Sequence, residues 1–321
     1  RHGSIAALVT RVMGGAPAQT VSQSPLQVAG NVPGNLLLVP SVEWPTLDSL
    51  ANLGAYTVSR AYVGYFDPGK CYKYSYNATE SLRHFYPVGT TSNHECTNNN
   101  AEWSGNYLNW AATQTIDPFR KALTGGHRVR DTSSETWLEK ARYDGNGGNS
   151  IYPDRRIPDG TGSNQSMVQR ATPVNNWNQV SIRIWQLGNR MRFQRSGDFS
   201  SATVVAYNPT VHTSFGSNDD TLYEVSVRVK VCDNTTGIGV EDNCKQYSGG
   251  WKPEGLVQQY SEALGYSVFG YLNDSNILRD GGVPCQRVNK VREGRPHVVD
   301  MIKNRELSLI VNTTEGKQAI K

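Results

Sequence analysis

Five cysteines are the residues of this 321-residue chain whose type and spacing point most directly to chemistry. Cys71 and Cys96 stand in a loop-rich stretch, and Cys232 and Cys244 bracket the polar, turn-prone sequence DNTTGIGVEDN. Neither pair has the C-x-x-C spacing that is typical of zinc ligands. We predict the disulfides Cys71–Cys96 and Cys232–Cys244, each stabilising the fold by roughly 3 to 3.5 kcal/mol through loop closure. The alternative is free buried thiols, and Cys285 has no predicted partner.

Disulfides would place the chain in an oxidising compartment outside the cytoplasm. The N-terminal sequence agrees, because Ala16-Pro17-Ala18 before Gln19 is similar to the A-x-A site of a signal peptidase. Residues 1–18 are therefore expected to be the remnant of an export signal or, alternatively, a disordered segment. The sequence has no run of about 18 apolar residues, so we expect no transmembrane segment.

The other reactive side chains do not favour an enzyme. The six histidines are scattered, and the sequence has no G-x-S-x-G, H-E-x-x-H or P-loop motif. The acidic pairs at 219–220 and 241–242 stand in turn-like sequence, and we expect them to be solvated or to be weak calcium ligands. Residues 94–96, His-Glu-Cys, could form a metal cluster, but a disulfide loop is the setting we expect. We predict a non-enzymatic protein with no cofactor.

The charged residues are distributed unevenly along the chain. Residues 285–321 contain eight Lys or Arg and four Asp or Glu, which accounts for the whole net charge of +4. Residues 1–284 carry no net basic field, so no nucleic-acid partner is predicted. The change in charge also marks a boundary near residue 285.

Hydrophobic patterns predict an alternation of helices and strands. The runs GNLLLVP at 34–40 and YSVFGYL at 266–272 are typical of strands buried on both faces. Apolar residues at helical spacing predict a helix over 104–116, and Pro in the first turn predicts another over 253–264. Residues 133–142, SSETWLEKAR, are interpreted as a further helix.

A polar insertion at 144–166 is followed by β-rich segments. Among them LYEVSVRVKVC alternates strictly and predicts a strand with one apolar face. That face would consist of Tyr223, Val225, Val227, Val229 and Val231. Buried strands and helices around a β-rich insert indicate the α/β class or, alternatively, α+β.

Several collinear stretches carry a family resemblance. They include VGYFDPGKCYKY, WSGNYLNWAATQTIDPFRKALTGGHRV, VKVCDNTTGIGVEDNC and WKPEGLVQQYSEALGYSVFGYLNDSNILRDGGV. Together they resemble the N-terminal region of PilY/PilC-type proteins, the tip adhesins and assembly factors of type IV pili, over residues 19–283. The resemblance implies a von Willebrand A-like domain with a β-rich polar insertion. It also implies an exported protein at the cell surface, pilus or outer membrane, with pilins or minor pilins and a host or abiotic surface as partners.

The metal site of von Willebrand A domains is built on D-x-S-x-S after the first buried strand. After NLLLVP the matching positions in this chain are Ser41, Glu43 and Pro45, so the leading Asp is lost and Pro has no side-chain donor. Asp274, after the second buried strand, is where a further carboxylate of such a site would stand. The resemblance therefore implies at most a degenerate metal site of Ser41, Glu43 and Asp274. The alternative is an ordinary strand end and a turn.

The C-terminal residues carry a different resemblance. The motifs EGRPH, DMIKN and VNTTEG within 287–321 are similar to the regulatory domain of the large subunit of carbamoyl-phosphate synthase. That resemblance implies a short helix-strand-helix tail, in which Asn312, Thr313 and Thr314 would bind the phosphate of an effector. Hydroxyl and backbone N–H groups at the start of a helix are suited to anions.

We therefore divide the chain into residues 1–18, a pilus-protein domain at 19–284 and a synthase-like tail at 285–321. The function we predict is pilus assembly, adhesion and surface contact without catalysis. The alternative is a chimeric chain whose tail binds a phosphorylated effector. A natural fusion, a misassembled gene and an engineered join all remain open as the origin of the boundary.

Overall fold

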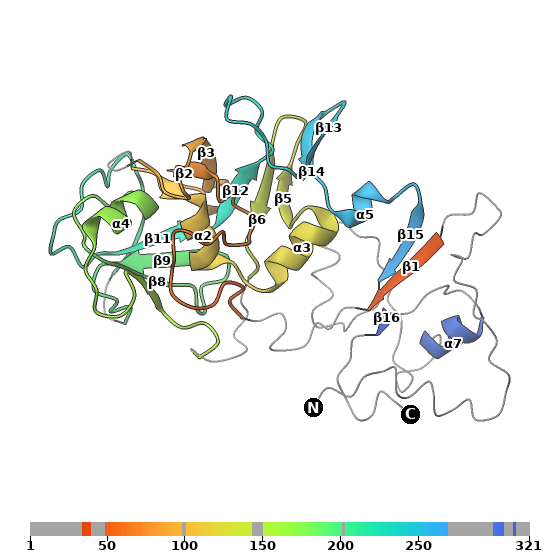
Figure 1. The fold of residues 1–321 in the computed structure, drawn as a ribbon, viewed down its shortest axis with the longest axis horizontal. Helices are drawn as coiled ribbons and strands as arrows, with labels where there is room; N and C mark the ends of the chain where they lie inside the picture. The colour runs from red at the N-terminus through yellow and green to blue at the C-terminus, as the bar shows by residue number, and fades with distance from the viewer. Residues whose placement is uncertain are drawn as a thin grey trace.

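The computed structural model describes residues 34–39, 49–97, 101–142, 150–200, 203–268, 298–304 and 311–312. These residues form a mixed α/β fold with two larger sheets, a hairpin and a small parallel sheet (Figure 1). Within these ranges no helix is long and apolar enough to cross a membrane.

The largest sheet has six strands in the order β4-β2-β3-β12-β6-β5. Their bounds are β2 (Lys70–Ser75), β3 (His84–Thr90), β4 (Trp103–Ser104), β5 (Arg128–Asp131), β6 (Thr136–Glu139) and β12 (Arg228–Val231). Neighbouring strands are antiparallel except β12 and β3, which run parallel. A parallel neighbour requires a long crossover, and the residues between β3 and β12 include the whole second sheet.

The second sheet has five strands in the order β10-β11-β9-β8-β7. Their bounds are β7 (Arg155–Ile157), β8 (Val180–Arg183), β9 (Arg190–Gln194), β10 (Val204–Ala206) and β11 (Leu222–Ser226). The hairpin consists of β13 (Cys244–Tyr247) and β14 (Gly250–Pro253). The helices are η1 (Glu80–Leu82), α2 (Gly105–Ala112), α3 (Ile116–Thr124), α4 (Gln165–Ala171), α5 (Leu256–Gln259) and α7 (Val298–Lys303).

The small parallel sheet joins distant parts of the chain. Strand β1 (Gly34–Val39) lies between β15 (Leu264–Val268) and β16 (Val311–Asn312), and it runs parallel to both. Figure 1 shows β1 and β15 side by side next to α5, outside the body formed by the two larger sheets. The two strands predicted from apolar runs therefore pair with each other, although the second begins two residues earlier than predicted. The prediction that both faces are buried is wrong for β1, where Leu37 is buried but Gly34 and Asn35 are exposed.

One alternating segment serves both larger sheets. All five residues of its predicted apolar face are buried, but the strand is interrupted at Val227, whose N–H donates to Asn189 O over 2.9 Å. Residues before the break form β11 in the second sheet, and residues after it form β12 in the first sheet. The alternation predicted which side chains are buried but not the change of sheet.

The predicted helix at 133–142 is wrong. Residues 136–139 form β6, paired with β5 on one side and β12 on the other. On one face of the strand Trp137 stacks on the His84 ring and is contacted by the Arg130 guanidinium, while Leu138 enters the core on the other face. Successive side chains on opposite faces require a strand, and tertiary packing overrides the helical propensity of the sequence.

The other two helix predictions hold only in part. The predicted helix at 104–116 ends at Ala112, and α3 (Ile116–Thr124) follows it. The C-cap Gly125, with a φ of 81°, ends α3 in a left-handed conformation. The predicted helix at 253–264 is reduced to α5, because β14 extends to Pro253 and β15 begins at Leu264.

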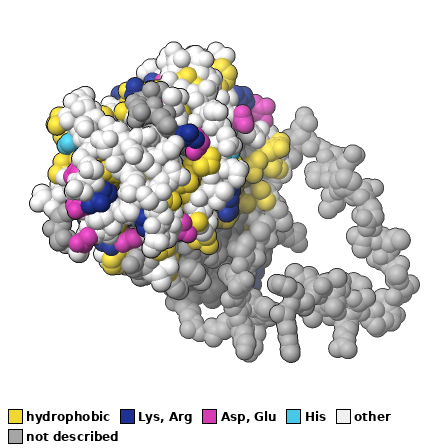
Figure 2. All heavy atoms as spheres, turned by 60° about the vertical axis from the view of Figure 1, so that its left-hand side comes forward, with side chains coloured by type: hydrophobic (Ala, Val, Ile, Leu, Met, Phe, Trp, Pro, Cys, Tyr) yellow, Lys and Arg dark blue, Asp and Glu magenta, His cyan; other side chains and the backbone are white. Residues whose placement is uncertain are grey.

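Aromatic side chains form the core between the two larger sheets. Trp103 is 1% exposed and contacts Phe85 and Phe193 edge-to-face, at ring-centroid distances of 5.8 and 5.3 Å. Phe85 comes from the first sheet and Phe193 from the second, so Trp103 packs against both. On the surface, basic and acidic side chains are interspersed over the face shown in Figure 2.

Buried Arg155 joins the start of the second sheet to α2. Its guanidinium stacks on the Trp110 ring at 3.8 Å and donates to the backbone carbonyls of Trp110, Asn52 and Gly54. Trp110 O belongs to the last turn of α2, where helical carbonyls need partners from outside the helix. Arg155 therefore holds the second sheet, α2 and the segment around Gly54 in one arrangement.

Candidate functional site

The structure contains both predicted disulfides. Cys71 and Cys96 are joined at an S–S distance of 2.01 Å, and Cys232 and Cys244 at 2.02 Å. The first connects β2 to the segment after β3, where Cys96 N donates to Arg170 O at the end of α4. The second closes the loop of residues 233–243 between β12 and β13. Cys285 lies outside the described residues.

The closed loop is held to β2 by a buried ion pair. Lys70 Nζ lies 2.9 Å from Glu241 Oε1, and both side chains are 6% exposed. Lys70 Nζ also donates to Gly239 O over 2.7 Å and lies 3.6 Å from Asp67 Oδ2. The second oxygen of Glu241 accepts from Cys232 N over 2.6 Å. The sequence predicted Glu241 to be solvated, and this is wrong because Lys70 provides its charge partner inside the fold.

The outer part of the loop is exposed and locally ordered. Residues 234–237 are exposed, whereas Asp233 is buried and accepts from Thr235 N and Thr235 Oγ1 at 3.0 and 2.6 Å. Lys230 Nζ lies 2.7 Å from Asp233. Burial raises the pKa of Asp233, but the hydrogen bonds of Lys230 and Thr235 outweigh it, and the pKa is lowered from its ordinary value. The ends of the loop are therefore fixed while its polar tip faces solvent.

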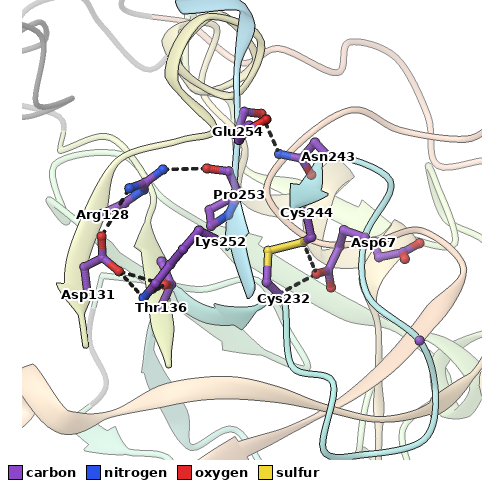
Figure 3. Close-up of a disulfide and its surroundings, with 12 residues drawn as sticks. Asp67, Arg128, Asp131, Thr136, Cys232, Asn243, Cys244, Lys252, Pro253 and Glu254 are labelled. Carbon is purple, nitrogen blue, oxygen red and sulfur yellow. Dashed lines mark hydrogen bonds and ion pairs between the residues drawn. A yellow bond between two sulfur atoms is a disulfide. The ribbon is translucent and has the colours of Figure 1, made fainter. Parts of the chain in front are cut away.

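The hairpin β13–β14 continues from the disulfide and is clamped to β5 and β6. Figure 3 shows Lys252 and Pro253 between the disulfide and the residues Arg128, Asp131 and Thr136. Lys252 Nζ donates to Thr136 Oγ1 over 3.0 Å and also to Asp131, and Arg128 donates to Pro253 O. The disulfide thus anchors one end of a hairpin whose other end leads into α5.

Comparison with known proteins gives a family match over the region of the first disulfide. The family model described as "PilY1 homolog, small alpha/beta domain" matches residues 54–204, which include Cys71 and Cys96. Residues 54–204 carry the small α/β domain of PilY1 homologues. The chain is also 50% identical over 276 residues to the protein named type IV pilus biogenesis factor PilY1 homolog from Xylella fastidiosa. The match covers 82% of this chain and 21% of that relative, so the chain spans about a fifth of its length.

The C-terminal part matches different proteins. The family model described as "MGS-like domain" matches residues 256–321. The large chain of carbamoyl phosphate synthase from Pseudomonas aeruginosa is 57% identical over 58 residues, covering 18% of this chain and 5% of that relative. The Pseudomonas putida protein of the same name is 57% identical over 86 residues, covering 27% of this chain and 8% of that relative. No solved structure matches this chain.

The MGS-like match includes α5 and the strands on both sides of β1. Strand β16 ends at Asn312, which pairs with Val39 at the end of β1. The other residues of the predicted anion and metal sites lie outside the described residues, and they are Ser41, Glu43, Asp274, Thr313 and Thr314. The structure therefore leaves both sites as predictions.

Two Cys/Glu groups in the described residues bring three candidate metal ligands within 4.8 Å of one another. They are Cys71, Cys96 and Glu102, and Cys232, Glu241 and Cys244. Each pair of sulfurs is bonded in a disulfide, so neither group offers the thiolate that binds metals. The four cysteines therefore serve as covalent connections between segments of the chain.

The other acidic groups named from the sequence bind basic or hydroxyl partners. Asp219 Oδ2 accepts from Tyr223 Oη over 3.0 Å, and Asp220 pairs with Arg195 at 2.9 Å. Glu95, beside Cys96, lies 3.0 Å from Arg170 of α4. Asp219, Asp220 and Glu95 therefore each have a protein partner and contribute to local structure.

A buried charge network that the sequence did not indicate joins the two larger sheets. Arg228, 3% exposed, lies 3.0 Å from Glu80 and also pairs with Glu139, which is 1% exposed. Asn189, directly before β9 of the second sheet, donates to Glu139 Oε2 over 2.9 Å. Arg228 stands at a polar position of the alternation in SVRVKV, where a charged side chain is expected to face solvent, so the local pattern carried no signal of its burial.

Proposed function

We propose that this chain acts in type IV pilus biogenesis as a non-enzymatic, exported module that serves pilus assembly, adhesion and surface contact. The observation that carries the proposal is the 50% identity over 276 residues to a protein named for that process. Because the chain spans about a fifth of that relative, we propose the role for this segment and not for the whole relative. Its partners would be pilins or minor pilins and a host or abiotic surface.

The rigidity of the two larger sheets and of the closed loop supports this proposal. Two disulfides and the buried ion pairs of Lys70 and Arg228 stiffen the two larger sheets and the closed loop. These groups have a structural role, which agrees with a non-enzymatic module. Disulfides persist in oxidising compartments, which agrees with export. The disulfide-closed loop presents exposed polar residues on a rigid base, an arrangement suited to recognition with little loss of conformational entropy.

We further propose that the parallel pair β1–β15 belongs to a von Willebrand A-like unit. Its support is the parallel pairing of two apolar strands that are far apart in the sequence. In this proposal Ser41, Glu43 and Asp274 follow the ends of these strands as the remains of a metal site. Calorimetric titration with Mg²⁺ tests it, and a Glu43→Gln variant that binds Mg²⁺ as the unaltered chain does would contradict it.

The pilus proposal is tested by removing the coding region of this chain from the encoding bacterium. We expect fewer surface pili by electron microscopy and fewer cells attached to glass, with both restored by the unaltered chain. Complementation with a Cys232→Ser/Cys244→Ser chain is the matched comparison, because it opens the closed loop without touching the first disulfide. Normal piliation and attachment after the deletion would refute the proposal.

A second function is favoured by the MGS-like match at residues 256–321. We propose as the alternative that the tail binds a phosphorylated effector through Asn312, Thr313 and Thr314. Isothermal titration with nucleoside monophosphates tests this, and binding that is lost in Thr314→Ala would favour it over the pilus proposal. Sequencing of RNA across residues 280–290 in the source separates a transcribed fusion from a misassembled gene.

A further inference from the structure

We propose that Cys232–Cys244 is a redox-active bond, opened by a dithiol reductant at Cys244 Sγ, and that Glu241 is the residue that stabilises its reduced form. The two disulfides differ in access. Cys71 and Cys96 are 1% and 3% exposed, so both of their sulfurs are enclosed. Cys232 is 5% exposed, but Cys244 is only half-buried. Thiol–disulfide exchange requires access to the sulfur that is attacked, which makes Cys244 the site of entry.

The contact of Glu241 with the disulfide supplies the second argument. Glu241 Oε2 lies 3.3 Å from Cys244 Sγ, which carries no hydrogen while it is bonded to Cys232. After reduction the Cys244 thiol can donate its proton to this carboxylate, and hydrogen bonds to charged acceptors are stronger than neutral ones. At the first disulfide Cys71 Sγ lies 3.7 Å from a neutral acceptor, Thr90 O. A disulfide whose reduced form is stabilised is easier to reduce.

The carboxylate would remain in place after the bond opens. Glu241 is oriented by Lys70 Nζ at 2.9 Å and by Cys232 N at 2.6 Å, and neither contact involves a sulfur. Lys70 also holds Gly239 O at 2.7 Å, and Asp67 lies 3.6 Å from the same ammonium. These contacts keep the loop on β2 in the reduced form, so the two thiols stay close enough to be reoxidised.

The exchange balances in two steps. The thiolate of the dithiol attacks Cys244 Sγ, the Cys232–Cys244 bond breaks, and the Cys232 sulfur leaves as a thiolate that takes up a proton. The second thiol of the reductant then attacks the mixed disulfide and releases Cys244, which takes the second proton and faces Glu241. Two electrons pass to the protein and the reductant becomes a disulfide.

Reduction would loosen the hairpin rather than unfold the body. The bond ties the end of β12 to the start of β13, and after its cleavage the hairpin is held by the contacts of Lys252 and Arg128 with β5 and β6. Because α5 follows β14 closely in the chain, the redox state of Cys232–Cys244 would set how firmly α5 is attached to the two larger sheets. The partner this implies is a thiol–disulfide oxidoreductase with a dithiol site.

The test measures how each bond opens in one chain. A Cys285→Ser chain, which prevents exchange with the fifth cysteine, is equilibrated in mixtures of reduced and oxidised dithiothreitol, alkylated, digested and analysed by mass spectrometry. We expect Cys232–Cys244 to open at a reductant-to-oxidant ratio at least about tenfold lower than Cys71–Cys96. If both bonds open at the same reductant-to-oxidant ratio, or if Cys71–Cys96 opens at the lower ratio, the proposal is overturned. This outcome does not depend on any substitution of Glu241.

The role of Glu241 is tested by Glu241→Gln, which keeps the shape but removes the charge of the acceptor. We expect the gap between the two bonds to shrink by about tenfold. Asp242→Asn is the matched control, because Asp242 is the exposed neighbour and should leave the gap unchanged. An unchanged gap in Glu241→Gln, with the oxidised variant retaining its near-ultraviolet circular dichroism, contradicts the role of Glu241. If that spectrum is lost, the order of opening in the Cys285→Ser chain alone decides the proposal.

Discussion

Lys70 and Glu241 form a buried ion pair, with 2.9 Å between Lys70 Nζ and Glu241 Oε1, that fastens the disulfide-closed loop to β2. The two residues stand 171 positions apart, and the ammonium also binds Gly239 O within the same loop. One lysine thereby neutralises the carboxylate that faces the Cys232–Cys244 bond.

Lys70→Met should destabilise the protein by about 3 to 5 kcal/mol, because it leaves Glu241 buried without a charge partner. Urea unfolding followed by tryptophan fluorescence measures the change. Lys245→Met is the control, since Lys245 is 61% exposed in its pair with Glu254 and such pairs contribute about 0 to 1 kcal/mol. Equal effects of the two substitutions would show that the Lys70 pair is not effectively buried.

Glu80→Gln should weaken the loss of stability in acid. Burial raises the pKa of the Glu80 carboxyl, but the hydrogen bonds and charge of Arg228, with Ser226 and Asn189, outweigh it and lower the pKa to about 2. A depressed carboxyl stabilises the folded state above its unfolded pKa, near 4.5, and this contribution is lost as the pH falls toward 2. The unfolding free energy should therefore decline less steeply over this window in the variant.

Chemical unfolding at several pH values between 5 and 2 gives this slope. Glu262→Gln, at an exposed position, serves as the control and should leave the slope unchanged. A Glu80→Gln variant with the same slope as the unaltered chain would show that the Arg228 network does not govern acid stability.

Arg155→Met should cost about 3 to 5 kcal/mol and separate the second sheet from α2. The substitution removes donors from three backbone carbonyls, each of which is costly to leave unsatisfied when buried. Thermal unfolding by circular dichroism measures the loss. Arg60→Met removes an exposed cation–π contact with Tyr62 and should change stability by about 1 kcal/mol or less. If Arg155→Met lowers the stability no more than Arg60→Met does, Arg155 does not hold these segments together.

Gly255→Ala should disturb the contact between α5 and α3. A Cβ at this position would lie 2.3 Å from Leu123 C and Thr124 N, both of which are backbone atoms that cannot rotate away. We expect a loss of about 1 to 3 kcal/mol, measured by urea unfolding. Gly249→Ala, where a Cβ meets nothing within 4 Å, should have little effect, and similar losses at both sites would contradict the close packing.

Local patterns in the sequence carried a substantial part of the fold. The strict alternation at 222–231 predicted that Val225 and Val229 are buried, because the side chains of a strand point to opposite faces in turn. The strand at 34–39 was predicted from its apolar run. Residues 136–139 were mispredicted as a helix because the packing of Trp137 against His84 is a contact between separate strands. No local pattern encodes such a contact.

The candidate site shows the same division. The spacing of the cysteines within turn-prone loops was sufficient to predict which pairs are bonded in the structure. The role of Glu241 could not be predicted, because its partner Lys70 lies in a different strand and reaches it only in the folded chain. Arg155 was missed for the same reason, since Gly54 O, one of its acceptors, is 101 positions away.

By itself the sequence determined the cysteine pairs, the apolar faces and the likeness to pilus proteins, because these depend on residue type and on spacing along one segment. The tertiary structure alone decided that β1 lies between β15 and β16, that one alternating run divides between two sheets, and that Lys70 neutralises Glu241. Those features depend on which distant segments meet. That is set by the packing of the whole chain, which brings Glu241 the charge partner that a buried carboxylate needs.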